Sequence, residues 1–191
     1  MQRVYHKILF LCLSVAFSLP LASQEAGFFN SPKGLGAQLR FSEREGIFHS
    51  VTAFVDIYGV PTGRCLYPGF RMNVSRQYVL QQLDKNDFEM VFYIGPGISA
   101  GYVHDHDKGR WFDFTSLVGG NSGFMLALSA DAGCRFDFGK RIAMDLSFAL
   151  DAGIHMRRNE NEKTYNATSL SIYNNGLLQL WYPQLTFLFK L

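Results

Sequence analysis

The chain has 191 residues, of which 48% are hydrophobic, 15% aromatic and only 18% charged, and its formal net charge is +2. Such a length allows one domain of ordinary size, with or without a processed segment. The low charge and high aromatic content disfavour a disordered chain, and three cysteines disfavour a disulfide-rich scaffold. A mean hydropathy of +0.00 argues against a bundle of membrane-spanning helices. What remains is a β-rich domain whose apolar residues face either a core or lipid.

The N-terminal segment has the layout of a secretory signal peptide. Arg3 and Lys7 precede an apolar run at residues 8–17, which is followed by a proline and small residues. This run is shorter than the about 20 apolar residues that a membrane-spanning helix needs. We therefore expect residues 1–23 to be cleaved and residues 24–191 to form a single domain. That domain has 16 basic and 16 acidic residues, and the neutral balance gives no reason to expect nucleic-acid binding.

Long stretches of the chain alternate between bulky apolar residues and small or polar ones. In residues 142–156 every even position is apolar, whereas the odd positions are Ala, Asp, Ser, Gly or His. Residues two apart share a face of a strand, so this pattern predicts a β-strand with two different faces. The same alternation occurs in residues 124–138. Gly139-Lys140 lies between the two segments and is typical of a two-residue hairpin turn.

Weaker alternation predicts further strands, which cover residues 35–42, 51–58, 70–75, 88–102 and 181–191. The connections between strands are either short, at 42–46, 83–87 and 139–140, or long, at 59–68, 104–122 and 158–176. Barrels of the bacterial outer membrane have an even number of strands, short periplasmic turns and long external loops. An eighth strand is therefore expected at residues 24–30. A second possibility is an extra hairpin arm at residues 169–173.

Strand length and the chemistry of the two faces favour a membrane barrel over a soluble sandwich. At roughly 3.3 Å per residue, the 142–156 strand would be about 50 Å long, which exceeds ordinary soluble strands and crosses a bilayer when tilted. Its second face carries small residues and scattered charges, which fit the narrow interior of a small barrel. We predict an all-β, transmembrane, antiparallel up-and-down barrel of eight strands, with the bulky face toward lipid.

This arrangement also predicts belts of aromatic residues at the two membrane interfaces. The outer belt would contain Tyr102, Phe124 and Trp181, and the inner belt Phe88, Phe136, Phe138, Phe187 and Phe189. It places Cys65 in an external loop and Cys134 near the periplasmic end of its strand. A disulfide needs Cα atoms within about 7 Å, so we expect two free thiols.

With its leader, its long alternating strands and its final segment Trp181–Leu191, the chain resembles the small outer-membrane β-barrel proteins of Gram-negative bacteria. The resemblance covers essentially the whole mature chain. It implies a monomer in the outer membrane, in contact with membrane lipid and lipopolysaccharide. It also implies that the barrel-assembly machinery recognises the final strand through Phe187, Phe189 and Leu191, although the family commonly ends in Phe.

Two motifs have residue types that suit chemistry but have simpler structural interpretations. His104-Asp105-His106-Asp107 carries ligands that divalent metals accept, yet a solvated external loop is polar without any metal. Gly95-Pro96-Gly97 is glycine-rich, but no Lys-Ser/Thr follows it and the segment alternates as a strand. Neither motif is assigned a ligand or cofactor.

The sequence also argues against a hydrolase triad of His49, Ser50 and Asp56. Strand parity points His49 to the opposite face from the other two residues. Some small barrels are lipid A deacylases or acyltransferases, but the deacylases' His-x-Ser-Asn pattern is missing from the sequence. No catalytic residue is assigned.

The remaining candidates are charged residues on the lumen side of the predicted strands, namely Asp131, Asp145, Asp151, Arg135, His155 and Arg157. Buried charges must pair or be solvated, so we expect a cross-strand network of ion pairs that fills the lumen. The sequence therefore favours a non-enzymatic barrel with a structural or surface-interaction role. The alternatives are a barrel-embedded lipid-modifying enzyme and a narrow channel or small-ligand carrier.

Overall fold

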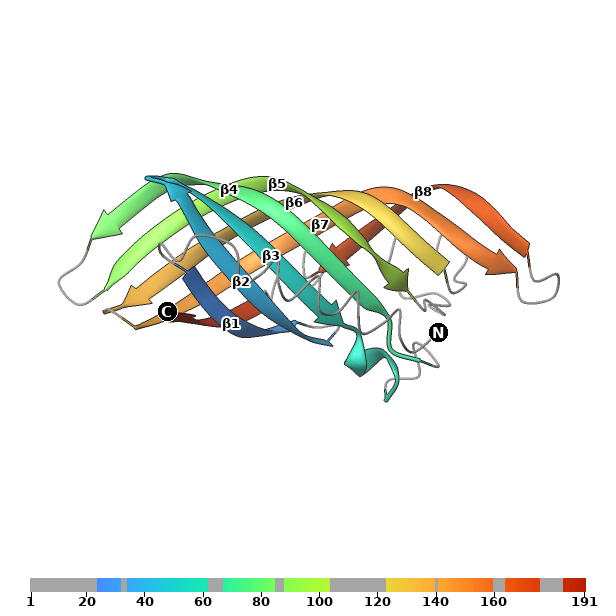
Figure 1. Ribbon diagram of the computed structural model, residues 1–191, viewed down its shortest axis with the longest axis horizontal. Coiled ribbons are helices and arrows are strands. Elements are labelled where there is room, and N and C mark those ends of the chain that lie inside the picture. Colours follow the sequence, from blue (N-terminus) through green and yellow to red (C-terminus); the bar gives the residue numbers. More distant parts are fainter. Residues whose placement is uncertain are drawn as a thin grey trace, which may run out of the picture.

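The computed structural model describes residues 24–31, 34–61, 67–84, 88–103, 123–139, 141–159, 164–175 and 184–191. These residues form one short 3₁₀ helix, η1 (Ile57–Gly59), and nine β-strands (Figure 1). The strands are β1 (Gln24–Ser31), β2 (Gly34–Arg44), β3 (Ile47–Val55), β4 (Phe70–Asp84), β5 (Glu89–Val103), β6 (Gly123–Phe138), β7 (Ile142–Asn159), β8 (Thr164–Asn175) and β9 (Gln184–Lys190). Within these ranges, no helix is long and apolar enough to cross a membrane.

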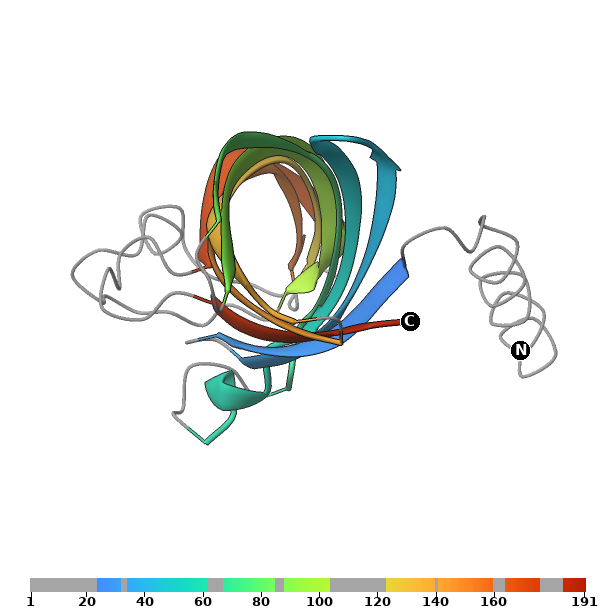
Figure 2. The same cartoon turned by 90° about the vertical axis from the view of Figure 1, so that its left-hand side faces the viewer.

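The nine strands occupy eight positions around one closed, antiparallel barrel (Figure 2). From β1 to β7, each strand pairs with the next one in the sequence. Two strands share the eighth position, because β9 pairs with residues 142–147 of β7 and β8 pairs with residues 149–159. Pairing of β9 with β1 then closes the ring. The predicted eight-position up-and-down barrel is confirmed.

The barrel has two different ends. The turn end carries the tight β2–β3 and β6–β7 turns, the β4–β5 connection and both ends of the barrel sequence, Gln24 and Lys190. The β3–β4 and β5–β6 connections lie at the opposite end, which we call the loop end. Two turn-end glycines have positive φ angles, 75° at Gly46 and 72° at Gly139. Glycine adopts this conformation without steric cost. A tight turn does follow β6 at Gly139, but three residues (139–141), rather than the predicted two, separate the paired residues Phe138 and Ile142.

Several strand boundaries differ from those expected, including the start of β3 at Ile47 rather than at residue 51. The 158–176 segment is not one long loop, because β7 continues to Asn159 and β8 begins at Thr164. The alternative hairpin arm is thus correct, and it is longer than expected. β4 extends to Asp84, beyond the predicted 70–75 range, because a bulge between Val79 and Gln81 shifts the alternation. β3 stops at Val55, where η1 follows.

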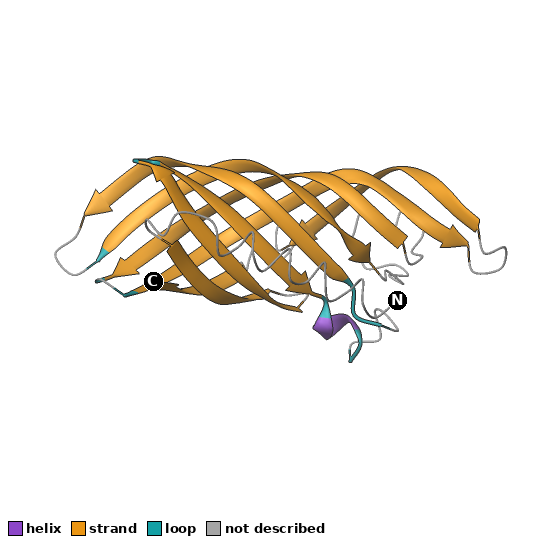
Figure 3. Ribbon diagram, viewed as in Figure 1, coloured by secondary structure: helices purple, strands orange, loops and turns teal. Residues whose placement is uncertain are grey.

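Tracing the register once around the barrel defines how the strands tilt. The path from Ala143 in β7 through β9 and on through β1 to β6 returns to β7 at Gly153, ten residues further along that strand. Eight strands with such a displacement have a tilt of about 35–45° and an interior that side chains fill. The strands therefore cross the barrel obliquely, as Figure 3 shows.

The barrel carries its large apolar side chains on the outside. Exposed members on β6 include Phe124, Leu126 and Leu128, the last with 71% of its surface exposed. Residues of opposite parity on the same strand, such as Ser129 and Asp131, are buried in the lumen. The predicted orientation of the two faces is confirmed. Transmembrane barrels place an apolar band against lipid and a polar lining inside, which is the arrangement found here.

Aromatic rings meet at both ends of the outer surface. Near the loop end, the rings of Tyr102 and Phe124 pack edge to face with centroids 4.8 Å apart. Near the turn end, Phe88 lies 6.3 Å from Phe136 and 6.4 Å from Phe138. These pairs agree with the two predicted aromatic belts.

Candidate functional site: the charged lumen

A buried ion pair crosses the lumen in its turn-end half. The guanidinium of Arg40 on β2 donates to the carboxylate of Asp145 on β7, and both side chains are nearly inaccessible, with 2% and 0% of their surface exposed. The hydroxyl of Tyr93 on β5 donates to the same carboxylate, 2.9 Å from Oδ1 and 2.8 Å from Oδ2. Arg40 also lies 4.7 Å from the ring centroid of Phe48 and 5.1 Å from that of Tyr93. Side chains from β2, β3, β5 and β7 therefore form one layer across the lumen.

A second ion pair crosses the lumen nearer the loop end. Arg71 Nη1 on β4 lies 2.6 Å from Asp151 Oδ2 on β7, and the hydroxyl of Ser99 on β5 donates to Asp151 Oδ1 at 2.7 Å. The Arg71 guanidinium lies 5.2 Å from the ring centroid of Phe54. Phe54 in turn stacks on Phe29, with centroids 6.0 Å apart. Phe54 interrupts the alternation of β3 because its ring supports this layer from inside the lumen.

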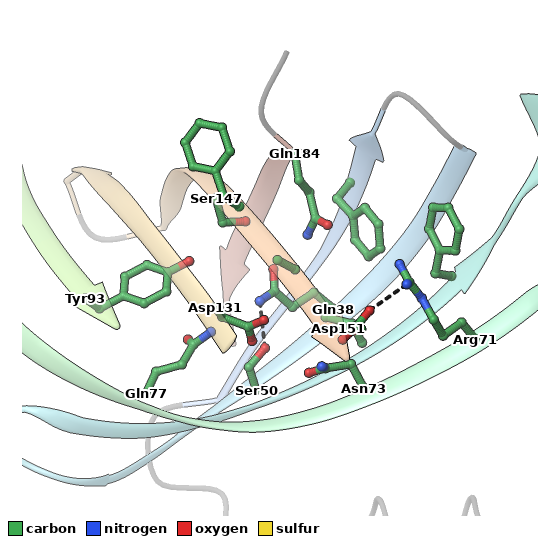
Figure 4. Close-up of a pocket in the computed structure, with 15 residues that line it drawn as sticks. Gln38, Ser50, Arg71, Asn73, Gln77, Tyr93, Asp131, Ser147, Asp151 and Gln184 are labelled. Carbon is green, nitrogen blue, oxygen red and sulfur yellow. Dashed lines mark hydrogen bonds and ion pairs between the residues drawn. The ribbon is translucent and has the colours of Figure 1, made fainter. Parts of the chain in front are cut away.

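Neutral polar side chains fill the space between the two ion pairs (Figure 4). Gln38 Nε2 donates to Ser50 Oγ at 2.7 Å. Asn73 Nδ2 donates to two hydroxyls, those of Ser99 at 2.9 Å and Ser129 at 2.6 Å. The cavity left between these groups has a volume of about 30 Å³. This space admits only a few water molecules, so the described side chains leave no wide passage at this level.

A third charged group lies at the turn end. Arg135 binds Glu25 through two hydrogen bonds of 2.7 and 2.5 Å, and it also lies 2.7 Å from Asp137. Lys190 Nζ lies 2.8 Å from the same Asp137 carboxylate. A cavity of about 320 Å³ is lined by these four residues and by Arg40. This vestibule ends where the Arg40–Asp145 layer begins.

The predicted network is confirmed for Asp145, Asp151 and Arg135, each of which forms a lumen ion pair. Asp131 is buried, but its closest polar neighbours are Ser75 and Gln77 rather than a basic residue. The side chains of His155 and Arg157 lie outside the described residues. Sequence reasoning missed several partners, namely Arg40, Arg71, Glu25, Tyr93 and Lys190. Their inward strand parity was the signal that could have identified them.

The other sequence candidates do not assemble into a site. Ser50 is buried in the lumen and bonded to Gln38, whereas His49 has the outward parity of β3 and Asp56 accepts a hydrogen bond from the Gly59 amide. The glycine motif at residues 95–97 lies within β5. A Cβ atom at Gly95 would lie 2.3 Å from the backbone oxygen of Arg76, so the glycine allows β4 and β5 to approach closely.

The metal and thiol candidates are only partly covered by the structure. Residues 104–107 and Cys65 lie outside the described part of the chain, and Cys134 carries a free thiol. Within the described ranges, no group of three or more His, Cys, Asp or Glu residues could hold a metal ion.

Phe148 also departs from the expected pattern. It lies among the even, apolar positions of β7, but it is half-buried and contributes to the lining of the 30 Å³ lumen cavity. The reason is local, since β7 changes partner at this residue. Ser147 pairs with Gln184 on β9, and Ala149 pairs with Asn175 on β8.

A closed antiparallel barrel with an apolar exterior and a charged, hydrogen-bonded interior is a transmembrane β-barrel. Barrels of this kind span the bacterial outer membrane, and the fold places the protein there.

No protein-family model matches the chain, and no curated protein matches its sequence. Among solved structures, the chain is similar to Neisserial surface protein A, with a TM-score of 0.42 and 10% identity over 88% of this chain and 94% of that one. It is also similar to a major outer membrane protein from Thermus thermophilus, with a TM-score of 0.42 and 11% identity over 89% of this chain and 100% of that one. The function is therefore inferred from the side chains of this chain.

Proposed function

We propose that the protein is a non-enzymatic outer-membrane barrel with a side-chain-filled lumen and a structural or surface-interaction role. The observation that carries this proposal is the pair of buried Arg–Asp layers, Arg40–Asp145 and Arg71–Asp151, with a cavity of about 30 Å³ between them. A hydrated solute would have to break both layers to pass. Interactions at the two ends and the outer surface then account for the function better than transport does.

The proposal includes an orientation and partners. The turn end faces the periplasm, the loop end faces the exterior, and residues 1–23 are cleaved before assembly. The monomer contacts membrane lipid and lipopolysaccharide through its apolar outer surface, and it binds no nucleic acid or cofactor. The barrel-assembly machinery binds the final strand, on which Phe187, Phe189 and Leu191 have 50%, 49% and 78% of their surface exposed.

A conductance measurement tests the filled lumen. The purified protein, refolded and inserted into a planar bilayer, is expected to give no stable conductance steps. The double variant Arg71→Ala/Asp151→Ala removes the loop-end layer but keeps the Arg40–Asp145 layer, so it should also stay closed. Stable, ohmic steps from the unmodified protein would support the channel alternative and contradict the closed lumen.

Two cellular measurements test the rest of the proposal. Mass spectrometry of lipid A from expressing cells should show no change in acyl chains, and a change would support the lipid-modifying alternative. A deletion strain is expected to lose envelope integrity or adhesion, because the proposed role lies in the membrane or at the cell surface. Mass spectrometry of the purified mature protein should give the mass of residues 24–191.

A further inference from the structure

Asp131 is a buried lumen carboxylate that forms no ion pair with a basic residue among the described side chains. The described part of the barrel contains five buried carboxylates, of which Glu25, Asp137, Asp145 and Asp151 each form an ion pair with Arg or Lys. Asp131 has 9% of its surface exposed, and its Oδ1 atom has no hydrogen-bond donor within that part of the chain. A buried carboxylate in a low-dielectric interior is unfavourable unless its charge is compensated.

Three amide oxygens share this condition. Gln38 Oε1, Asn73 Oδ1 and Gln77 Oε1 are buried and receive no hydrogen bond from the described residues. The amide nitrogens of Gln38 and Asn73 donate to serine hydroxyls, which fixes the orientation of these two amide groups. An unsatisfied buried acceptor is unfavourable, so four of them on residues that line one cavity require an explanation.

All four oxygen-bearing residues line the same cavity of about 30 Å³ (Figure 4). Hydroxyl groups of Ser50, Thr52 and Ser147 belong to the same lining. The residues around the cavity thus carry one unpaired carboxylate, three amide carbonyls and hydroxyls, around a space that is large enough for a small ion. Neighbouring Asp151 adds no net charge, because it is paired with Arg71.

We propose that this cavity binds a single dehydrated, monovalent alkali cation between Asp131, Gln38, Asn73 and Gln77. Hard cations prefer oxygen ligands, and the unsatisfied atoms here are all oxygens. One positive charge neutralises the Asp131 carboxylate, whereas a divalent ion would leave an excess positive charge in the interior. Water molecules in the cavity could donate to these oxygens, but they would leave the carboxylate charge uncompensated.

Stability in different salts tests the proposal. The protein, refolded in neutral lipid vesicles, is unfolded by urea in NaCl, KCl or choline chloride at equal ionic strength. A cation present at about 100 times its Kd lowers the unfolding equilibrium constant about 100-fold, whereas choline is too large to enter. We expect the unmodified protein to be more stable in NaCl or KCl than in choline chloride. Equal stability in all three salts would overturn the proposal.

Asp131→Asn is the diagnostic variant, because it keeps the side-chain shape and removes the charge that binds the cation. It should be equally stable in the three salts. Asp84→Asn is the matched control, since Asp84 is an exposed carboxylate at the turn end of β4 and should leave the salt dependence unchanged. Salt dependence that survives in Asp131→Asn would contradict the assignment.

A crystallographic measurement does not depend on the variants folding. Crystals of the unmodified protein grown with Tl⁺ in place of Na⁺ or K⁺ should show an anomalous difference peak beside Asp131 Oδ1 and the three amide oxygens. A water molecule with no anomalous signal at this position would overturn the proposal.

Discussion

The Arg40–Asp145 pair is the contact whose disruption should destabilise the barrel most clearly. In the variant Asp145→Asn, the side chain keeps its size and one acceptor for the Tyr93 hydroxyl, but Arg40 loses its counter-charge. Arg40 has 2% of its side-chain surface exposed, so the unpaired guanidinium would be poorly hydrated. Its contacts with the rings of Phe48 and Tyr93 exist before and after the change and therefore do not compensate.

Removing one partner of a buried ion pair costs about 3–5 kcal/mol. We expect a loss of about 3 kcal/mol, the lower end of this range, because the 320 Å³ vestibule next to Arg40 can supply water to the unpaired charge. Replacing both charged residues should cost less than removing the carboxylate alone, since no uncompensated charge remains. The double variant Arg40→Met/Asp145→Asn is expected to stay within about 1.5 kcal/mol of the unmodified protein.

Equilibrium urea titrations of the refolded protein in lipid vesicles, followed by circular dichroism, measure these differences. Migration of unheated samples on SDS gels provides a second readout of the folded barrel. Glu45→Gln serves as the control, because Glu45 is an exposed carboxylate in the β2–β3 turn. The reasoning is refuted if Asp145→Asn is as mild as this control, or if the double variant loses the sum of the two single losses.

Three further substitutions test other parts of the structure with the same titration. Leu128→Arg places a charge on the lipid-facing side of β6 and should lower the free energy of unfolding by about 2–4 kcal/mol. The lumen substitution Ser147→Ala should lower it much less. Equal losses would mean that the two faces are wrongly assigned. Gly139→Ala should cost about 1–2 kcal/mol, because the φ of 72° is unfavourable for alanine, and an unchanged stability would contradict this turn geometry. Lys190→Met removes a partly exposed partner of Asp137 and should cost less than about 1 kcal/mol at low salt; a loss of the same size in 1 M salt would argue against an electrostatic origin.

The faces of the strands could be predicted from the sequence because strand periodicity reports directly on them. Leu128 and Asp151 have opposite roles, and the parity of their strands assigns each role without any knowledge of the fold. The position of the hairpin turn at Gly139 could be predicted for a similar reason, since a local glycine marks it, although the turn has three residues rather than the predicted two. Local patterns were sufficient for both features.

The partners in the lumen could not be predicted in this way. Arg40 and Asp145 lie 105 residues apart, and they meet only because the register displaces the strands by ten residues around the barrel. No pairwise pattern in the sequence specifies that displacement. β8 was missed as a main strand for a different reason, since Thr164–Asn175 lacks the strict alternation of apolar and polar residues.

Because β8 and β9 share the eighth position, the length of the strand pairing differs from place to place around the barrel. β9 pairs with six residues of β1 on one side and six of β7 on the other, whereas the β6–β7 ladder joins sixteen residues of each strand. Fewer backbone hydrogen bonds therefore hold β9, where the two ends of the sequence meet, than hold the neighbouring β6–β7 ladder. Amide hydrogen exchange should accordingly be fastest along β9 and slowest in β6. The wall formed by β5, β6 and β7 thus provides the rigid frame, and the ring opens first at β9.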